Sequence, residues 1–211
     1  MKQYLIKNKF FVFYLLIFIF YSVGVIGILN NDIRPYFLPL SWVILFMSFL
    51  AVVITRETKG IGFCFFLVIC YLISMLTEGV GVNTGLLFGS YEYGANLGFK
   101  IFGVPLIIGV NWTVLIISTA AFFNKLKNFW IRVLLSSLLM VGIDFLMEPV
   151  AIKLDFWIWE GAIPFYNYVC WFLTSLIIHI IYDLMKLNKP NNIPRFLFCI
   201  LVLFFIILNF N

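Results

Sequence analysis

The amino-acid sequence predicts an all-α, polytopic membrane protein with about seven transmembrane helices in one bundle. Three observations predict this fold class. The composition is 64% hydrophobic and only 11% charged, the mean hydropathy is +1.11, and the 211 residues divide into apolar stretches of membrane-spanning length. Because lipid offers the backbone no hydrogen-bond partner, each such stretch is expected to be a helix.

Seven predicted spans follow one another along the chain, and residues 1–211 are expected to form a single membrane domain. The first span is too long for a secretion signal and is followed by no small-residue cleavage site, so it is expected to remain as a helix. In order, the spans are Phe10 to Leu29, Tyr36 to Thr55, Ile61 to Thr77, Ile101 to Phe123, Trp130 to Ala151, Tyr168 to Met185 and Pro194 to Phe210.

The basic residues predict the orientation of the bundle. All of the 14 lysines and arginines except Arg34, Lys100 and Lys153 fall before the first span or after the second, fourth and sixth spans. Basic loops stay in the cytoplasm, so we expect a cytoplasmic N-terminus and an external C-terminus. The groups on the cytoplasmic side are Lys2, Lys7, Lys9, Arg56, Lys59, Lys125, Lys127, Arg132, Lys186, Lys189 and Arg195.

This distribution also bears on localisation, partners and cofactors. The net charge of +5 follows from topology and indicates no nucleic-acid partner. We expect a multi-pass protein of the cell membrane, in bacteria the inner membrane, surrounded by membrane lipids. The four cysteines form no CxxC pair and have no neighbouring histidine, so neither a disulfide nor a metal site is predicted.

One long polar stretch, TEGVGVNTGLLFGSYEYG from Thr77 to Gly94, separates two apolar spans. It contains Glu78, Asn83, Tyr91 and Tyr93 among many glycines, which indicates that a polar group is held there. The alternative is an ordinary long loop in which the glycines form turns.

Two carboxyl groups lie inside a predicted span. Asp144 and Glu148 are four residues apart in VGIDFLMEPVAIK, which places them on one helix face. At about 1.5 Å per residue, Glu148 lies level with Glu78 near the outer surface and Asp144 one turn deeper. Ionisable residues at membrane depth mark functional sites by default. The alternative is that the pair caps loop groups or binds Lys100 and Lys153.

The chemistry of such a pocket follows from its low dielectric constant. Carboxyl groups held close together there repel each other, so at least one is expected to keep its proton and to be able to protonate carbon. Its ionised partner can activate water. Asn111 and Trp112, on the span that descends beside them, are within reach of the same pocket.

Two further groups of residues have competing interpretations. His179 and Asp183 are four apart and form either a proton-handling pair or, more in keeping with their position, a structural hydrogen bond. An aromatic cluster surrounds Asn167 and forms either a wall for a flat apolar substrate or an interfacial aromatic belt. Its members are Trp157, Trp159, Tyr166, Tyr168 and Trp171.

The residues in these two regions resemble the carotenoid biosynthesis family that includes bisanhydrobacterioruberin hydratase and carotenoid 1,2-hydratases. The first block is EGVGVNTG from Glu78 to Gly85, FGSYEY from Phe88 to Tyr93, Leu97-Gly98 and GVPL from Gly103 to Leu106. The second block is Asp144, Glu148-Pro149-Val150, Trp157, Trp159, Gly161, Pro164, Asn167 and Trp171. Leu87 and Cys170 depart from the family pattern, which has proline and glycine at these places.

The resemblance implies hydration of the terminal C1=C2 bond of an acyclic carotenoid, without a cofactor. Asp144 or Glu148 would be the acid, and Glu78 or the other carboxyl would orient the water. The binding residues would be Asn83, Tyr91, Tyr93, Asn111, Trp112, Trp157, Trp159, Asn167 and Trp171. The C50 substrate belongs with haloarchaea, whose proteins are usually acidic, so the charge of +5 favours a bacterial C40 substrate such as lycopene or γ-carotene.

Two alternatives and one kind of partner remain open. A carotenoid cyclase-type isomerase would quench the same cation by losing a proton. A non-enzymatic seven-helix transporter or photoreceptor is the other alternative, but the last span has no lysine to bind retinal. Other enzymes of the carotenoid pathway are possible partners.

Overall fold

The computed structural model describes residues 2–56 and 60–211, and the side chains from residue 10 onward. Within this part, seven helical segments are long and apolar enough to cross a membrane, which confirms the predicted fold class. The helices are α1 (Lys2–Leu29), α2 (Arg34–Phe37), η1 (Leu38–Leu40), α3 (Ser41–Ile54), α4 (Ile61–Thr84), α5 (Leu106–Phe123), α6 (Phe129–Lys153), α7 (Phe165–Leu184) and α8 (Asn192–Asn209). The second segment combines α2, η1 and α3.

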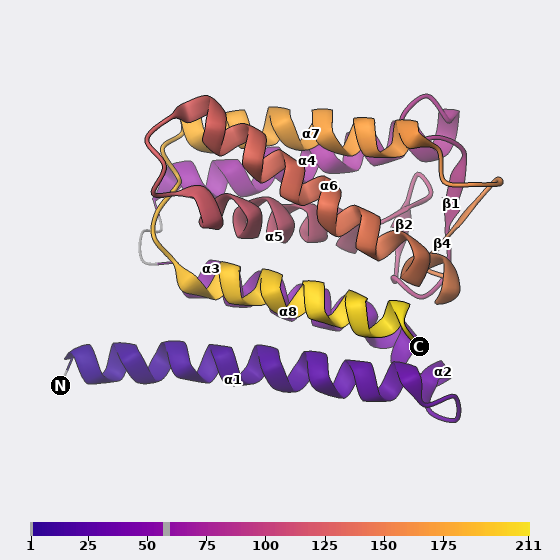
Figure 1. Ribbon diagram of the computed structural model, residues 1–211, viewed down its shortest axis with the longest axis horizontal. Coiled ribbons are helices and arrows are strands. Elements are labelled where there is room, and N and C mark those ends of the chain that lie inside the picture. Colours follow the sequence, from indigo (N-terminus) through magenta and orange to yellow (C-terminus); the bar gives the residue numbers. More distant parts are fainter. Residues whose placement is uncertain (1, 57–59) are drawn as a thin grey trace.

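The spanning helices alternate in direction (Figure 1). The N-terminus and the α5–α6 and α7–α8 connections lie at one end, and the strands and the C-terminus lie at the other. This alternation agrees with the predicted order of spans. The assignment of one end to the cytoplasm remains a prediction, and one basic residue of that argument, Lys59, lies outside the described residues.

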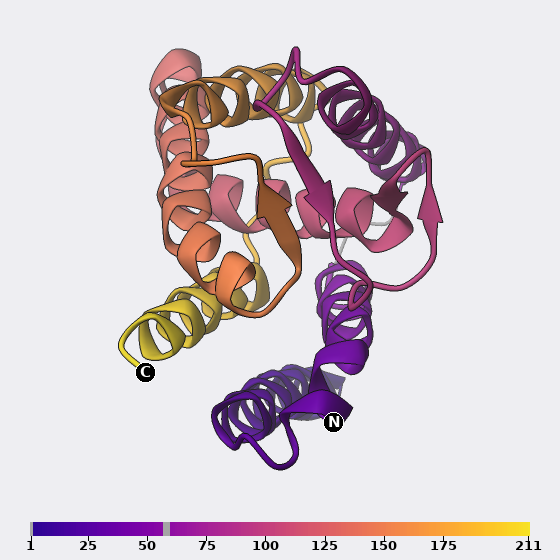
Figure 2. The ribbon, with the colours of Figure 1, turned by 90° about the vertical axis from the view of Figure 1, so that its right-hand side faces the viewer.

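Helix α5 is the centre of the bundle. In its membrane-length window 72% of the residues are buried, against 44% or less in the other described spans. Helices α3, α4, α6, α7 and α8 all pack against it (Figure 2). Gly109 permits the close approach of α4, since a Cβ there would lie 2.7 Å from the Tyr71 ring. Helix α1 is outermost and packs mainly on α8, with smaller contacts to α2 and α3.

Two short antiparallel strand pairs close the end of the bundle. β1 (Tyr91–Tyr93) pairs with β4 (Trp157–Trp159), and β2 (Lys100–Ile101) pairs with β3 (Val104–Pro105). Figure 2 shows β1 and β4 crossing the end between α4, α6 and α7. Tyr91 lies opposite Trp159 and Tyr93 opposite Trp157. Because alternate residues of a strand share a face, these four aromatic side chains lie on one face of the pair.

The structure corrects two predicted helix boundaries near this end. Helix α4 continues to Thr84 instead of ending at Thr77, so Glu78 and Asn83 are helical. It ends at Gly85, whose φ of 66° is the left-handed conformation that glycine adopts without strain. Helix α5 begins at Leu106 and not at Ile101, because residues 100–105 form the β2–β3 hairpin.

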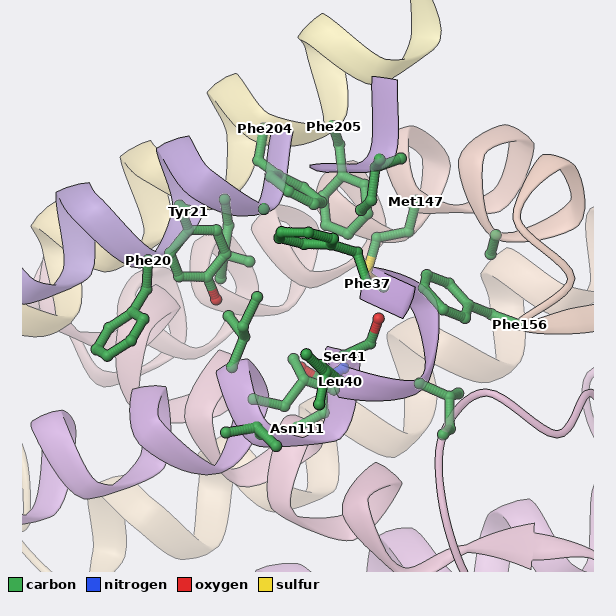
Figure 3. A pocket seen from close by; sticks show the side chains of 18 of the residues that line it. Phe20, Tyr21, Phe37, Leu40, Ser41, Asn111, Met147, Phe156, Phe204 and Phe205 are labelled. Carbon is green, nitrogen blue, oxygen red and sulfur yellow. The ribbon is translucent and has the colours of Figure 1, made fainter. Parts of the chain in front are cut away.

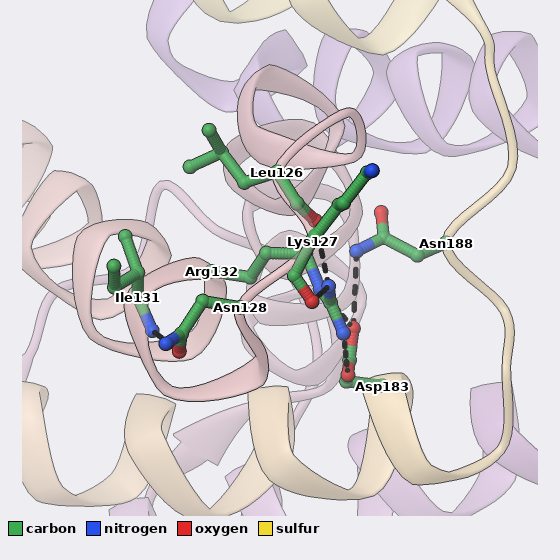
Figure 4. A network of polar contacts seen from close by, with 7 residues as sticks. All are labelled: Leu126, Lys127, Asn128, Ile131, Arg132, Asp183 and Asn188. Atoms are coloured by element: carbon green, nitrogen blue, oxygen red, sulfur yellow. Dashed lines mark hydrogen bonds and ion pairs between the residues drawn. The ribbon is translucent and has the colours of Figure 1, made fainter.

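A polar network ties α6 to α7 at the opposite end (Figure 4). Arg132 donates to both carboxylate oxygens of Asp183, from Nε at 2.9 Å and Nη2 at 2.6 Å. Its Nη1 donates to the carbonyls of Leu126 and Lys127. His179 bonds instead to Thr119 at 3.0 Å and to the Ser175 carbonyl at 2.8 Å. Among the described residues His179 and Asp183 share no hydrogen bond, so the expected pair between them was wrong.

Candidate active site

Glu78 lies on the last turns of α4 and is only 3% exposed. Its carboxyl group accepts hydrogen bonds from the Tyr91 hydroxyl, from the Tyr93 hydroxyl at 2.8 Å and from Nε1 of Trp112 at 2.9 Å. Both phenols contact Oε2, whereas the indole of Trp112 contacts Oε1. Trp112 is fixed in turn by stacking on Trp171 of α7, with ring centroids 4.2 Å apart. Residues of α4, α5 and β1 therefore fix the position of this carboxyl.

Glu148 lies on α6 and is only 2% exposed. Its Oε2 accepts from Nε1 of Trp157 at 2.9 Å and from Nε1 of Trp159 at 2.8 Å. Its Oε1 accepts from Nδ2 of Asn167 at 3.2 Å. All three partners are N–H donors, and an indole N–H can only donate.

Asp144 lies one turn deeper on the same helix and is fully buried. Nδ2 of Asn167 also donates to its Oδ2, at 2.9 Å, so one amide group bridges the two carboxyls of α6. The other oxygen, Oδ1, has no hydrogen-bond partner among the described residues. The expected alternative of ion pairs with Lys100 and Lys153 is not observed in the described part of the chain, where Lys100 donates to the backbone carbonyl of Tyr93.

The β1–β4 pair supplies donors to both glutamates. Tyr91 and Tyr93 on β1 bind Glu78, and their cross-strand neighbours Trp159 and Trp157 bind Glu148. Burial and the adjacent Glu78 raise the pKa of both phenols, so each hydroxyl keeps its proton and can donate. The strand pair thus joins the two carboxyls into one site.

A small cavity of about 20 Å³ lies between the two glutamates. A space of roughly 10–15 Å³ by this measure is enough for one water when polar partners surround it. Its lining residues are Glu78, Phe88, Tyr91, Tyr93, Glu148, Trp157, Trp159, Asn167 and Trp171. Asp144 is not among them, and its link to this cavity is the hydrogen bond that it accepts from Asn167.

A second, apolar cavity of about 250 Å³ adjoins the site (Figure 3). Its walls come from α1, α2, η1, α3, α5, α6 and α8, and Figure 3 shows the aromatic rings of Phe20, Phe37, Phe156, Phe204 and Phe205 around it. Trp157 lines both cavities. One indole ring therefore separates the polar space from the apolar one.

The structure brings most of the predicted site residues together, with two exceptions. Asn83 donates to the carbonyls of Gly79 and Phe102 near the end of α4, away from the carboxyls. Asn111 lines the apolar cavity and not the polar one. Both belong to helices, where a shift of one residue turns a side chain by about 100°.

Two aromatic residues of the predicted cluster lie outside the site. Tyr166 is 48% exposed and donates to the carbonyl of Leu86, and Tyr168 packs on Phe145. Sequence reasoning missed Phe88, which lines the polar cavity, and the whole apolar cavity. The alternation in Tyr91-Glu92-Tyr93 and Trp157-Ile158-Trp159 was a signal for the strands. Within the described residues, no cluster of three His, Cys, Asp or Glu side chains is suited to a metal.

Comparison with known proteins agrees with the resemblance noted in the sequence. Residues 40–210 match the family model described as "Carotenoid biosynthesis protein". A bisanhydrobacterioruberin hydratase of Haloarcula japonica is 25% identical over 164 residues, which cover 71% of this chain and 54% of that relative. The chain thus spans about half the length of this curated relative. No solved structure matches.

Proposed function

The chain belongs to the carotenoid biosynthesis protein family, and from this premise we propose that it is a membrane-embedded hydratase. It adds water to the terminal C1=C2 double bond of an acyclic carotenoid end group of the lycopene or γ-carotene type. The observation that carries the proposal is the water-sized cavity of about 20 Å³ between Glu78 and Glu148. A hydratase needs such a place, where one water is held beside two groups that exchange protons.

The proposed reaction has three steps: protonation, addition of water and loss of a proton. An acid donates a proton to C2, which leaves a tertiary cation at C1. The water oxygen then forms a bond to C1, and a carboxylate takes the proton that this water releases. The proton returns to the acid before the next turnover, so only water is consumed and the scheme needs no cofactor.

The hydrogen-bond partners suggest which carboxyl is the acid. Glu148 contacts N–H donors alone, so in this arrangement it can only accept, as a base must. Oε2 of Glu78 faces two phenol oxygens, each of which can accept a hydrogen bond from a protonated carboxyl as well as donate one to a carboxylate. We therefore assign the acid to Glu78 and the water-orienting base to Glu148.

The remaining groups of the site support this chemistry in two ways. Asn167 and Asp144 position Glu148, because the same amide nitrogen binds both carboxyls. The rings of Tyr91, Trp157 and Trp159 line the cavity, and aromatic faces stabilise a nearby cation by their negative electrostatic potential. A bacterial inner membrane and delivery of the substrate through the bilayer, with other carotenoid-pathway enzymes nearby, are parts of the same proposal.

The test is expression in a lycopene-producing bacterium, followed by mass analysis of the pigments. We expect products that are heavier than lycopene by one water, or by two where both ends react, and that carry ¹⁸O when the cells grow in labelled water. Asn83→Ala is the matched control for substitutions of the site carboxyls such as Glu78→Gln, and it should still hydrate lycopene, since Asn83 binds only backbone carbonyls at the same end of the bundle.

The other outcomes are equally informative. A product with the mass of lycopene but a different retention time would identify the cyclase-type isomerase and reject hydration. Unchanged lycopene, with the protein present in the membrane, would reject both carotenoid activities on this substrate.

A further inference from the structure

We infer that the apolar cavity beneath α1 binds the hydrocarbon chain of the substrate and leads its end group to the carboxyl site past Trp157. This inference rests on the proposed function. The polar cavity of about 20 Å³ has room for a water but none for an end group of the substrate. The apolar cavity of about 250 Å³ is the larger space that adjoins it.

The mouth of this cavity faces the lipid. Phe20 and Val23 of α1 and Leu40 of η1 line it, and they are 36%, 47% and 50% exposed on the outer surface of the bundle. These residues belong to the first two predicted spans, so a ligand reaches them from the hydrocarbon layer. An apolar chain moves from lipid to this lining without losing hydrogen bonds, whereas a polar molecule would lose them.

The inner wall of the cavity is continuous with the site. Met147 and Ala151 line it from α6, on either side of Glu148 in the sequence. Trp157 presents its ring to the cavity and its N–H to Glu148. A chain whose reactive carbon is at its tip is therefore brought to the carboxyl when its body fills the cavity.

One polar group in the wall distinguishes the hydroxylated product from the acyl chain of a lipid. Asn111 is a half-buried amide in the cavity wall, and it forms no hydrogen bond to the described residues. An acyl chain offers it nothing. A linear isoprenoid that gains one hydroxyl group on hydration does offer a partner, so this amide favours the hydroxylated product over an acyl chain.

The test measures pigment retention without turnover. Each variant carries Glu78→Gln, is produced in lycopene-forming cells and is purified in detergent, and the lycopene bound per protein is read from its visible absorbance. Gly24→Leu and Ala151→Leu fill the cavity from two different helices. Gly142→Leu is the control, because a Cβ at Gly142 meets no atom within 4 Å.

We expect retention to fall about tenfold or more in the two filled variants, since overpacking of an occupied space is unfavourable, and to stay unchanged in the control. Equal retention in filled and control variants, at equal membrane abundance, overturns the inference, as does a parent that retains no lycopene. Asn111→Leu, which removes the amide without changing the backbone, is expected to retain lycopene but to lose the hydroxylated pigment when that is supplied instead.

These outcomes are independent of catalysis. If the wild-type protein fails to hydrate lycopene but the filled variants still lose it, the proposed function is rejected and the binding site stands. If hydration proceeds normally in Gly24→Leu and Ala151→Leu made with Glu78 intact, the binding site is rejected and the proposed function stands.

Discussion

Replacing each glutamate by glutamine separates the two carboxyls, because their hydrogen-bond partners differ. In Glu78→Gln, the new carbonyl accepts from Trp112, and the new NH₂ donates to the phenol oxygens of Tyr91 and Tyr93. Phenols accept as well as donate, and their own hydrogens can turn toward the adjoining cavity. This substitution should therefore leave the fold nearly unchanged.

In Glu148→Gln, no comparable rearrangement gives every polar group a hydrogen-bond partner while Asp144 is ionised. The new carbonyl accepts from the two indoles, so the new NH₂ faces the NH₂ of Asn167. Asn167 can turn its amide, but its oxygen then faces Asp144, which loses its partner. One buried polar group without a partner costs about 1–3 kcal/mol. On the scale of soluble domains this is a decrease in Tm of roughly 2–12 °C.

The sign of the pH dependence follows from the same contacts. A protonated Asp144 can donate to the turned Asn167, and the mismatch disappears. The stability deficit of Glu148→Gln is therefore present where Asp144 is ionised and is lost as the pH falls through its titration. The assay is thermal unfolding of the purified protein in detergent over a pH range from acidic to alkaline. Both variants should also lose hydration by a factor of about 100 or more.

Two results would refute this reasoning. Equal Tm values for the two variants at every pH from acidic to alkaline would show that the partners of Glu148 do not constrain it as described. Normal hydration by either variant would remove that glutamate from the mechanism, whatever its effect on stability.

Three further predictions test other parts of the structure. Asn83→Ala should keep the hydration rate within about twofold of the wild-type rate, as expected for a substitution away from the site. A loss as large as that of Glu78→Gln would show that Asn83 contributes to the site. Gly85→Val should lower the amount of folded protein in the membrane, because Gly85 has a φ of 66° and a Cβ there would lie 3.1 Å from Oγ of Ser90. Gly79→Ala is the control, since a Cβ at Gly79 meets no atom within 4 Å. Equal abundance of the two variants would contradict this prediction. Reporter fusions should read external near Glu160 and cytoplasmic after Lys127, and the opposite pattern would reverse the predicted orientation.

The sequence predicted the helices and the depth of the carboxyls, because both follow from regular helical geometry. Glu78 and Glu148 line the same cavity, as counting along α4 and α6 indicated. The ends of the helices were less predictable. Helix α4 extends through Gly79 and Gly81, which weaken a helix in isolation. At Gly81, however, a Cβ would lie 2.9 Å from Phe88, so the site requires glycine there.

The residues that bind the carboxyls could be predicted from the sequence, but which residue binds which carboxyl could not. Tyr93 and Trp157 are far apart in the sequence, and their pairing depends on the register of β1 and β4. That register is permitted by Gly94, whose N–H donates to the carbonyl of Phe156 at 2.8 Å and whose Cβ, if present, would collide with the carbonyl of Asp155. A single sequence shows the glycine but not the strand that approaches it.

The position of the strand pair explains how two carboxyls on different helices come to line one cavity. Helices α4 and α6 carry Glu78 and Glu148 to the same depth, but helix packing alone tolerates shifts that would separate their oxygens. The β1–β4 pair removes this freedom, because its backbone hydrogen bonds fix Tyr93 against Trp157 while their polar atoms bind one glutamate each. The ring that completes this arrangement, Trp157, is also a wall of the apolar cavity. Occupation of that cavity and the geometry of the carboxyl site are therefore linked through one side chain.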